Sequence, residues 1–202
     1  MTDSETRDVA LMVLAGEVNK GMVVELERLG TSALGICGAD AGAVRCVALS
    51  EDPGSTQNLG LVGRPTEVNR GFFESLLGQE IMPVVSSLAL GEDFQLYSVN
   101  ADHMASVCAW GTGCEALVYL TDVPGVRGGD GAVLARISRQ DIEGFRNQGI
   151  ISGGMLPKTS SCLEALDRGV PAVYILPGVS QGILRRLLDG ALEEGTFIYD
   201  NN

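Results

Sequence analysis

The run Ala116-Leu117-Val118-Tyr119-Leu120-Thr121-Asp122-Val123-Pro124-Gly125 has the pattern of a buried strand followed by a loop. Residues 116–120 are uniformly apolar, as in strands covered on both faces, and the Pro-Gly pair predicts a turn. Further on, residues 133–137 predict another strand, and Ser138 predicts the N-cap of a helix that reaches Gln148. This alternation predicts an α/β layered fold with a largely parallel sheet, whose ligands bind beyond the C-terminal ends of the strands.

The same alternation extends along the rest of the chain. A long helix is predicted over residues 5–29, opened by a capping box of Thr2 and Glu5. A strand at 32–37 is followed by a turn and a returning strand at 44–49. The other predicted strands are 59–62, 81–86, 94–99, 172–176 and 196–199, and the other helices are 68–77, 101–110, a segment ending at 166, and 181–188.

The composition bounds the class of protein. The chain has 202 residues, 45% of them hydrophobic, which suits one globular domain or two small lobes that share a sheet. Its net charge of −12 argues against non-specific nucleic-acid binding, which needs clustered cations. No run approaches the ~18 apolar residues of a membrane span, and the acidic start is unlike a signal peptide. We therefore expect a cytoplasmic protein with no membrane partner.

The cysteines and the single histidine argue against several kinds of site. The five cysteines are odd in number and show no C-x-x-C spacing, which makes a disulfide framework or a zinc site a poor interpretation. Because His103 is the only histidine, we expect no metal held by protein side chains and assign this residue a structural role.

A glycine-rich loop enters a helix in the run Gly149-Ile150-Ile151-Ser152-Gly153-Gly154-Met155-Leu156-Pro157-Lys158. The free N–H groups at a helix start attract anions, and Lys158 adds a mobile positive charge suited to a phosphate. The alternative is a glycine hinge beside a surface lysine. A Walker A loop is excluded, because Pro157 stands where that motif has glycine and has no N–H to donate.

Two further stretches join a strand to the segment after it. In Asn100-Ala101-Asp102, Asp102 predicts either a helix N-cap or a carboxylate that orients a cation, and the cap is the simpler interpretation. Residues 121–125 predict either an ordinary strand exit or a ligand-contacting loop, and their place at the C-terminal end of a strand favours the ligand. Gly128-Gly129-Asp130-Gly131 predicts a plain hairpin turn.

Several motifs, in order along almost the whole chain, resemble the acetylglutamate kinases of the amino acid kinase superfamily. They are Leu14-Ala15-Gly16-Glu17-Val18-Asn19-Lys20, Gly35-Ile36-Cys37-Gly38-Ala39-Asp40, Val99-Asn100-Ala101-Asp102, Leu120-Thr121-Asp122-Val123-Pro124-Gly125-Val126, the Gly149–Lys158 loop and Glu194-Gly195-Thr196-Phe197-Ile198. The resemblance implies a three-layer α/β/α sandwich with a mainly parallel central sheet, lacking its N-terminal strands. It implies that residues 1–98 are the remainder of an acceptor-substrate and dimerisation lobe, and that residues 99–202 are a nucleotide-binding lobe.

The resemblance also implies the chemistry. Such enzymes move the γ-phosphoryl group of MgATP to the side-chain carboxylate of N-acetyl-L-glutamate, in arginine biosynthesis. It implies that Lys158 stabilises the transferring group, that Asp102 holds catalytic lysines in position, and that Asn100 and Ser98 lie beside acetylglutamate. Ser98 stands where the family has asparagine, and its side chain is shorter. The implied nucleotide site consists of Thr121, Asp122, Val123, Gly125, Val126, Gly149, Ile151, Gly153, Gly154 and Met155.

Two assembly features are implied as well. Mg²⁺ is expected to be held mainly by ATP oxygens and water, with no protein ligand. A homodimer is expected through the first long helix. The family also carries an N-terminal strand with a phosphate-binding lysine, a Gly-Gly loop and a substrate arginine, none of which precedes Met1-Thr2-Asp3.

Three explanations of this missing segment remain open. A misplaced start is favoured over a separate N-terminal lobe and over a remnant that binds nucleotide without catalysis. We expect little or no kinase activity from the chain alone. Another acylated amino acid, of the aminoadipate type, is an alternative substrate.

Overall fold

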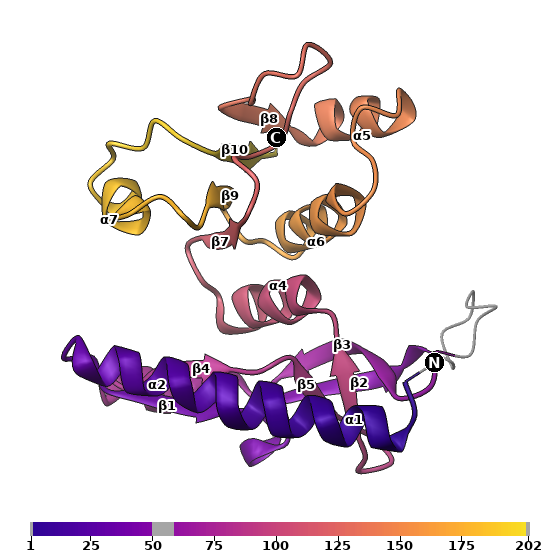
Figure 1. Cartoon of the computed structure of the whole chain (residues 1–202), viewed down its shortest axis with the longest axis vertical. Helices are drawn as coiled ribbons and strands as arrows, with labels where there is room; N and C mark the ends of the chain where they lie inside the picture. Colours follow the sequence, from indigo (N-terminus) through magenta and orange to yellow (C-terminus); the bar gives the residue numbers. More distant parts are fainter. Residues whose placement is uncertain (1, 50–58, 201–202) are drawn as a thin grey trace. The chain divides into compact units, whose positions relative to one another are not determined.

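The chain forms two compact units, Met1–Thr112 and Gly113–Asn202 (Figure 1). The computed structural model describes residues 2–49 and 59–200. Of the strand pairs among these residues, five are parallel and three antiparallel, so the predicted α/β class is confirmed. None of the helices in the described ranges combines the length and apolar character needed to cross a bilayer. The roles predicted for residues 1–98 and 99–202 stay predictions.

One continuous helix opens the first unit, as predicted. It consists of α1 (Ser4–Ala10), a π-helical segment η1 (Leu11–Val18) and α2 (Asn19–Arg28). The predicted capping box of Thr2 and Glu5 is wrong, because the Asp3 carboxylate is the N-cap and accepts the Thr6 N–H at 2.8 Å. That hydrogen bond lowers the pKa of Asp3. The π-helical segment carries no signal in the sequence, since its apolar spacing is that of an ordinary helix.

The strands of the first unit form two separate sheets. β1 (Ala33–Ile36) pairs in parallel with β4 (Met82–Val85). β2 (Val44–Ala48), β3 (Val62–Val68), β6 (Leu96–Val99) and β5 (Leu88–Gly91) pair in that order as a small closed barrel. The predicted return of β2 along β1 is therefore wrong. The short 3₁₀ turn η2 (Asp40–Gly42) instead leads the chain from one sheet into the other.

Gly38 explains why the chain changes sheets at this point. Its N–H donates to the Leu88 carbonyl at 2.7 Å, and the Val44 N–H donates to its carbonyl at 3.1 Å. A Cβ at residue 38 would lie 2.6 Å from both the Ala89 Cα and the Val44 oxygen. Only glycine lets the backbone pass so close to the barrel.

β3 begins where the predicted strand 59–62 ends, and it includes Pro65. Proline argues against a strand because it has no N–H for the ladder. Here the register shifts between Arg45 and Cys46, opposite Pro65, so a bulge accommodates the proline. Helices α3 (Arg70–Gly78) and α4 (Ala101–Thr112) complete the unit, close to their predicted positions.

Cys46 lies in the core of the barrel and is 1% exposed. Burial, with a smaller contribution from Asp93, raises the pKa of its thiol to about 11. Cys114, by contrast, is exposed. Because the thiolate is the nucleophile, the barrel protects Cys46 both sterically and by suppressing ionisation.

We expect iodoacetamide at pH 8 to alkylate Cys114 while leaving Cys46 unmodified in the native protein. With a pKa near 11, only about one Cys46 thiol in a thousand is ionised at pH 8. Peptide mapping by mass spectrometry after a timed quench measures both sites. Equal rates at the two cysteines would contradict the burial of Cys46, and urea-unfolded protein serves as the control in which both react.

The second unit contains a four-stranded sheet in the order β7 (Leu117–Thr121), β9 (Val173–Pro177), β10 (Thr196–Tyr199), β8 (Arg136–Ser138). Its helices are α5 (Arg139–Asn147), α6 (Met155–Asp167) and α7 (Ile183–Leu188). The Ser138 N-cap is confirmed, and Asp141 completes a capping box that lowers the pKa of its own carboxyl. The hairpin turn at 128–131 is also confirmed, with the Gly128 N–H donating to the Ala132 carbonyl at 2.9 Å.

Candidate active site

The C-terminal edge of the parallel pair β7 and β9 carries the first group of predicted residues. Thr121 ends β7 opposite Pro177, and its carbonyl accepts the Gly178 N–H at 2.8 Å. Its hydroxyl donates to the Asp122 carboxylate at 3.1 Å. Asp122 is exposed, and Val123 and Thr121 are half-buried. Their position at this edge is where α/β sheets bind ligands.

Gly125 and Val126 form the base of this loop rather than its surface. Gly125 has a φ of +147°, and a Cβ there would lie 2.6 Å from the Thr196 hydroxyl. Val126 is 1% exposed, and its N–H donates to the same hydroxyl at 2.8 Å. These two residues hold the loop against β10. They would therefore affect a ligand only by positioning the backbone of the loop.

The glycine-rich loop 149–154 lies between α5 and α6. Gly149 and Gly153 have positive φ angles of +71° and +56°, so neither position suits another residue. A Cβ at Gly149, Gly153 or Gly154 would meet nothing within 4 Å, so a ligand has open access to this backbone. Gly154 is the N-cap of α6 and supplies no side chain to the helix start. Ile151 is buried and anchors the loop.

Lys158 lies on the first turns of α6 and is half-buried. Its Nζ lies 5.0 Å from the centroid of the ring of Tyr119, a buried residue of β7. The ring attracts the ammonium group and limits its range of positions. The structure thus links α6 with β7, which carries the other loop. Met155, the first residue of α6, is half-buried.

Arg146 is a positioning residue that the sequence analysis missed. It lies in α5, and its Nη2 donates to the Thr159 hydroxyl at 2.7 Å, the Ser160 hydroxyl at 2.9 Å and the Leu156 carbonyl at 3.2 Å. Thr159 is fully buried. Arg146 therefore fixes the start of α6, one turn from Lys158. Basic residues are common in the last turn of a helix because they interact favourably with the helix dipole, so the position of Arg146 in the sequence does not indicate this role.

Arg146→Met is expected to lower the free energy of unfolding by about 2 kcal/mol, because charge-assisted hydrogen bonds are lost and the buried Thr159 loses a donor. Urea denaturation measures this change. Arg185→Met is the matched control, because the Arg185 side chain is 80% exposed and pairs with Asp189, the C-cap residue of its own helix α7. That control is expected to change stability by less than about 0.5 kcal/mol. Equal effects of the two substitutions would contradict the role given to Arg146.

In the first unit, the predicted substrate residues lie where β6 enters α4. Asn100 is the N-cap of α4, because its Oδ1 accepts the N–H groups of Asp102 at 2.9 Å and of His103 at 3.3 Å. The prediction of Asp102 as the cap is wrong, and this half-buried carboxylate lies in the first turn instead. Among the described residues, the Asn100 Nδ2 has no partner. Ser98 lies half-buried on β6, paired with Val62 and Leu88.

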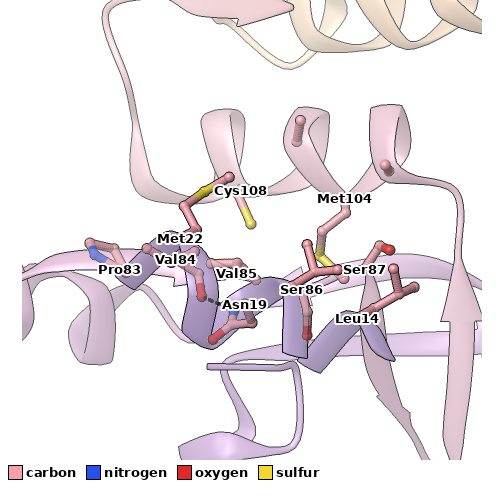
Figure 2. A pocket seen from close by; sticks show the side chains of 13 residues that line it. Leu14, Asn19, Met22, Pro83, Val84, Val85, Ser86, Ser87, Met104 and Cys108 are labelled. Carbon is pink, nitrogen blue, oxygen red and sulfur yellow. Dashed lines mark hydrogen bonds between the residues drawn. The ribbon is translucent and has the colours of Figure 1, made fainter. Parts of the chain in front are cut away.

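A cavity of about 410 Å³ lies between the N-terminal helix, β4 and α4 in the same unit (Figure 2). Asn19 lines it, is 3% exposed, and donates from Nδ2 to the Val84 carbonyl at 2.8 Å. Its Oδ1 accepts the Lys20 Nζ at 3.2 Å, and the same Nζ donates to the Gly35 carbonyl at 2.7 Å. A Cβ at Gly35 would overlap the Asn19 oxygen. The helix and the sheet are thus joined by a buried polar contact.

The side chains and backbone groups at the candidate site determine which ligand fits there. The described residues contain no group of three or more His, Cys, Asp or Glu side chains that could hold a metal ion. A nucleotide phosphate fits better, since the 149–154 loop presents glycine backbone that no Cβ covers, beside a lysine and at a helix start that no side chain caps. The arrangement therefore suits an anion more than a bare cation.

The geometry is that of an α/β protein with a candidate anion site, and the comparisons with known proteins identify the family. Residues 1–177 match the amino acid kinase family, and the chain belongs to that family of enzymes. Among curated proteins, it is 43% identical over 196 residues to the acetylglutamate kinase of Acidobacterium capsulatum, covering 97% of this chain and 74% of that one. It is 42% identical to the acetylglutamate kinase of Koribacter versatilis, with the same coverage.

Solved structures show the same fold. The structure of smu.665 from Streptococcus mutans is similar with a TM-score of 0.80 and 25% identity, covering 98% of this chain and 73% of that one. An N-acetylglutamate synthase from Neisseria gonorrhoeae is similar with a TM-score of 0.85 and 20% identity, covering 99% of this chain and 45% of that one. At that identity the synthase supports the fold alone.

Proposed function

We propose that the chain carries the activity of an acetylglutamate kinase, moving the γ-phosphoryl group of MgATP to the side-chain carboxylate of N-acetyl-L-glutamate. The reaction belongs to arginine biosynthesis and takes place in the cytoplasm. The observation that carries the proposal is the 43% identity to a curated acetylglutamate kinase over 97% of the chain. The glycine-rich loop 149–154, which lies beside Lys158 and leads into a helix with no side-chain cap, supports the proposal independently.

The chemistry asks little of the protein beyond positioning and charge. A carboxylate acceptor is ionised at pH 7, so no general base is needed, and phosphoryl transfer proceeds by alignment and electrostatic stabilisation. Lys158 stabilises the negative charge on the transferring group, and Tyr119 and Arg146 fix where it acts. Mg²⁺, held by ATP oxygens and water, neutralises the phosphates when bound.

We assign the nucleotide to the second unit. The backbone of loop 149–154 and the start of α6 at Met155 receive the phosphates, and the loop Thr121–Val123, supported from below by Gly125 and Val126, borders the nucleotide. This assignment rests on the C-terminal edge of β7 and on the uncovered glycine backbone. Isothermal titration with MgADP tests it, because Gly154→Val would cover the backbone and is expected to abolish binding.

We assign the acceptor substrate to the first unit. With its Oδ1 used as the helix cap, Asn100 has its Nδ2 hydrogens to donate to acetylglutamate. Asp102 orients cationic side chains of the site. Ser98 contributes a hydroxyl in place of the longer amide, which leaves room for a longer acyl amino acid. N-acetyl-aminoadipate is therefore the second candidate substrate.

The assay compares the chain alone with a completed chain. In the completed chain, the portion of the Acidobacterium capsulatum kinase that this chain does not match is joined before residue 1. We expect acetylglutamate-dependent ADP release from the completed chain and little or none from the chain alone. If the completed chain phosphorylated N-acetyl-aminoadipate but not acetylglutamate, N-acetyl-aminoadipate would be the substrate. If the completed chain bound MgATP but phosphorylated neither compound, the protein would have only a nucleotide-binding role.

We further propose a homodimer through the first long helix. Val9, Met12 and Val13 form an exposed apolar patch there, with exposures of 54%, 65% and 40%. Apolar groups of this size at one helix turn are typical of a buried contact. Sedimentation velocity is expected to show a dimer that Met12→Glu converts to a monomer, and a wild-type monomer at micromolar concentration would contradict the proposal.

A further inference from the structure

Several loops of the second unit meet at one edge of its sheet. The parallel strands β7 and β9 both end there, at Thr121 and Pro177. β10 runs antiparallel to β9, with Thr196 opposite Ile175, so the segment before β10 reaches the same edge. The Gly178 N–H donates to the Thr121 carbonyl at 2.8 Å. The loop after β9 and the segment before β10 are therefore neighbours of the loop 121–125, which we assign to the nucleotide.

The segment before β10 contacts the base of the loop 121–125. A Cβ at Gly125 would lie 2.6 Å from the Thr196 hydroxyl and 3.2 Å from the carbonyl carbon of Gly195. A cavity of about 260 Å³ lies beside this contact, and Pro124 and Glu194 both line it. Glu194 therefore lies close to the loop that borders the nucleotide in our assignment.

The acidic side chains at this edge are a problem for a phosphate site. Glu193 and Glu194 are both exposed, and both line the same cavity. MgADP carries a net negative charge, so a carboxylate near its site weakens binding by Coulomb repulsion. A phosphate-binding edge is therefore expected to neutralise such a carboxylate or to hold it away from the ligand.

Arg186, in α7, neutralises one of these two carboxylates. Its Nη2 donates to the Glu194 carboxylate at 2.6 Å and to the Ser180 hydroxyl at 2.8 Å, and its Nη1 donates to the Gln181 carbonyl at 2.7 Å. The Ser180 hydroxyl donates to the same Glu194 oxygen at 2.9 Å. Two donors thus fix the Glu194 carboxylate, and one guanidinium joins the loop after β9 to the segment before β10.

The arginine beside it in the sequence makes a different contact. The Arg185 side chain is 80% exposed and pairs with Asp189, the C-cap residue of α7. The Arg186 side chain is 35% exposed and its partner Glu194 is 44% exposed, so this pair is less accessible to solvent and less screened. The two arginines carry the same charge on one helix, so their comparison separates the position of the charge from its amount.

We propose that Arg186 is a positioning residue of the nucleotide site, which acts by holding Glu194 and cancelling its charge. The proposal rests on the proposed function, because that function places the nucleotide at this edge. In this role Arg186 touches no substrate and lowers the negative potential that the phosphates meet. Loss of Arg186 is therefore expected to raise the Kd for MgADP. In the completed chain it should raise the KM for ATP and leave kcat at saturating ATP unchanged.

Isothermal titration of the 202-residue chain with MgADP tests the proposal without any need for turnover. Arg186→Met is expected to raise the Kd about tenfold at low salt, because Glu194 is left with an uncompensated charge. Arg185→Met removes the same charge from the same helix and is expected to change the Kd by less than about twofold. Thermal unfolding of each variant confirms that it is folded at the temperature of the titration.

Two further variants separate the charge of Arg186 from its structural contacts. Arg186→Met combined with Glu194→Gln breaks the same contacts but leaves no unpaired charge, so the Kd should return to within about threefold of the parent. Arg186→Lys keeps the charge and should also stay within about threefold. The ratio of the Arg186→Met and parent Kd values should fall at high salt, because ions screen the exposed carboxylate.

The possible outcomes also separate this proposal from the proposed function. Equal Kd values for Arg186→Met and the parent would overturn the proposal alone, as would a double variant that binds as weakly as Arg186→Met. A parent chain that binds no MgADP would overturn the nucleotide assignment and this proposal together. A completed chain that binds MgADP but transfers no phosphoryl group would overturn the kinase activity and leave the role of Arg186 standing.

Discussion

Lys158→Met in the completed chain is expected to lower kcat for ADP formation by about two to three orders of magnitude. The loss of one preorganised charge at the transferring phosphoryl group typically has an effect of this size. The KM for acetylglutamate should change little, because Lys158 belongs to the nucleotide side of the proposal. Methionine keeps the length and much of the stem of lysine, so the packing on Tyr119 is largely preserved. Steady-state ADP release measures the effect.

The control for this prediction is Lys158→Arg. Arginine keeps the positive charge and the attraction to the Tyr119 ring, so part of the activity should return. Thermal unfolding of all three proteins should agree within a few degrees. A Lys158→Met enzyme within tenfold of the parent would show that Lys158 is a surface lysine beside a glycine hinge.

Gly38→Ala is expected to lower the free energy of unfolding by about 3 kcal/mol or more. The new Cβ would lie 2.6–2.7 Å from the Ala89 Cα and the carbonyl oxygens of Val44 and Leu88. All three are backbone atoms of the barrel, so no side chain can rotate to relieve the overlap. The hydrogen bond from the Gly38 N–H to Leu88 would lengthen as well. Urea denaturation followed by circular dichroism measures the loss.

Gly21→Ala is the matched control for Gly38→Ala. Gly21 lies in α2, and a Cβ there meets nothing within 4 Å. Alanine favours the helix, so this variant should be more stable by about 0.5–1 kcal/mol. If Gly38→Ala lowers the free energy of unfolding while Gly21→Ala raises it, the loss at Gly38 is due to its close contacts. If both variants were equally stable, the conclusion that the barrel leaves no room for a Cβ at residue 38 would be wrong.

Local patterns in the sequence predicted most elements but not their pairing. The long helix, β7, α5 and α6 follow from apolar spacing and capping residues that lie within each element. β3 extends beyond the predicted strand through Pro65, a residue that normally argues against a strand, and a bulge at Thr66 in β3 itself accommodates the proline. The incorrect prediction that β2 pairs with β1 has a similar cause. The sequence between the two strands is that of a simple turn, but the Gly38 N–H in that turn donates to Leu88, which lies 50 residues further along the chain.

The same distinction applies to the candidate site. The glycine loop and Lys158 were found because their chemistry is contained in ten consecutive residues. Asn19 was missed as a buried contact because its partner Val84 lies 65 residues away. Arg146 was missed because its value depends on the buried hydroxyl of Thr159. Asn100, and not Asp102, caps α4. The sequence alone could not distinguish these two nearby candidates, because the choice depends on where the backbone becomes helical.

The overlap that a side chain at Gly35 would make with Asn19 has an evolutionary consequence. The two positions form a mutational pair: any larger residue at 35 requires a shorter one at 19, and the Lys20 ammonium then loses its acceptor there. Each single step passes through a destabilised intermediate, so drift at these sites is slow. A deep mutational scan should therefore find few tolerated single changes at either position and a small set of compensated doubles.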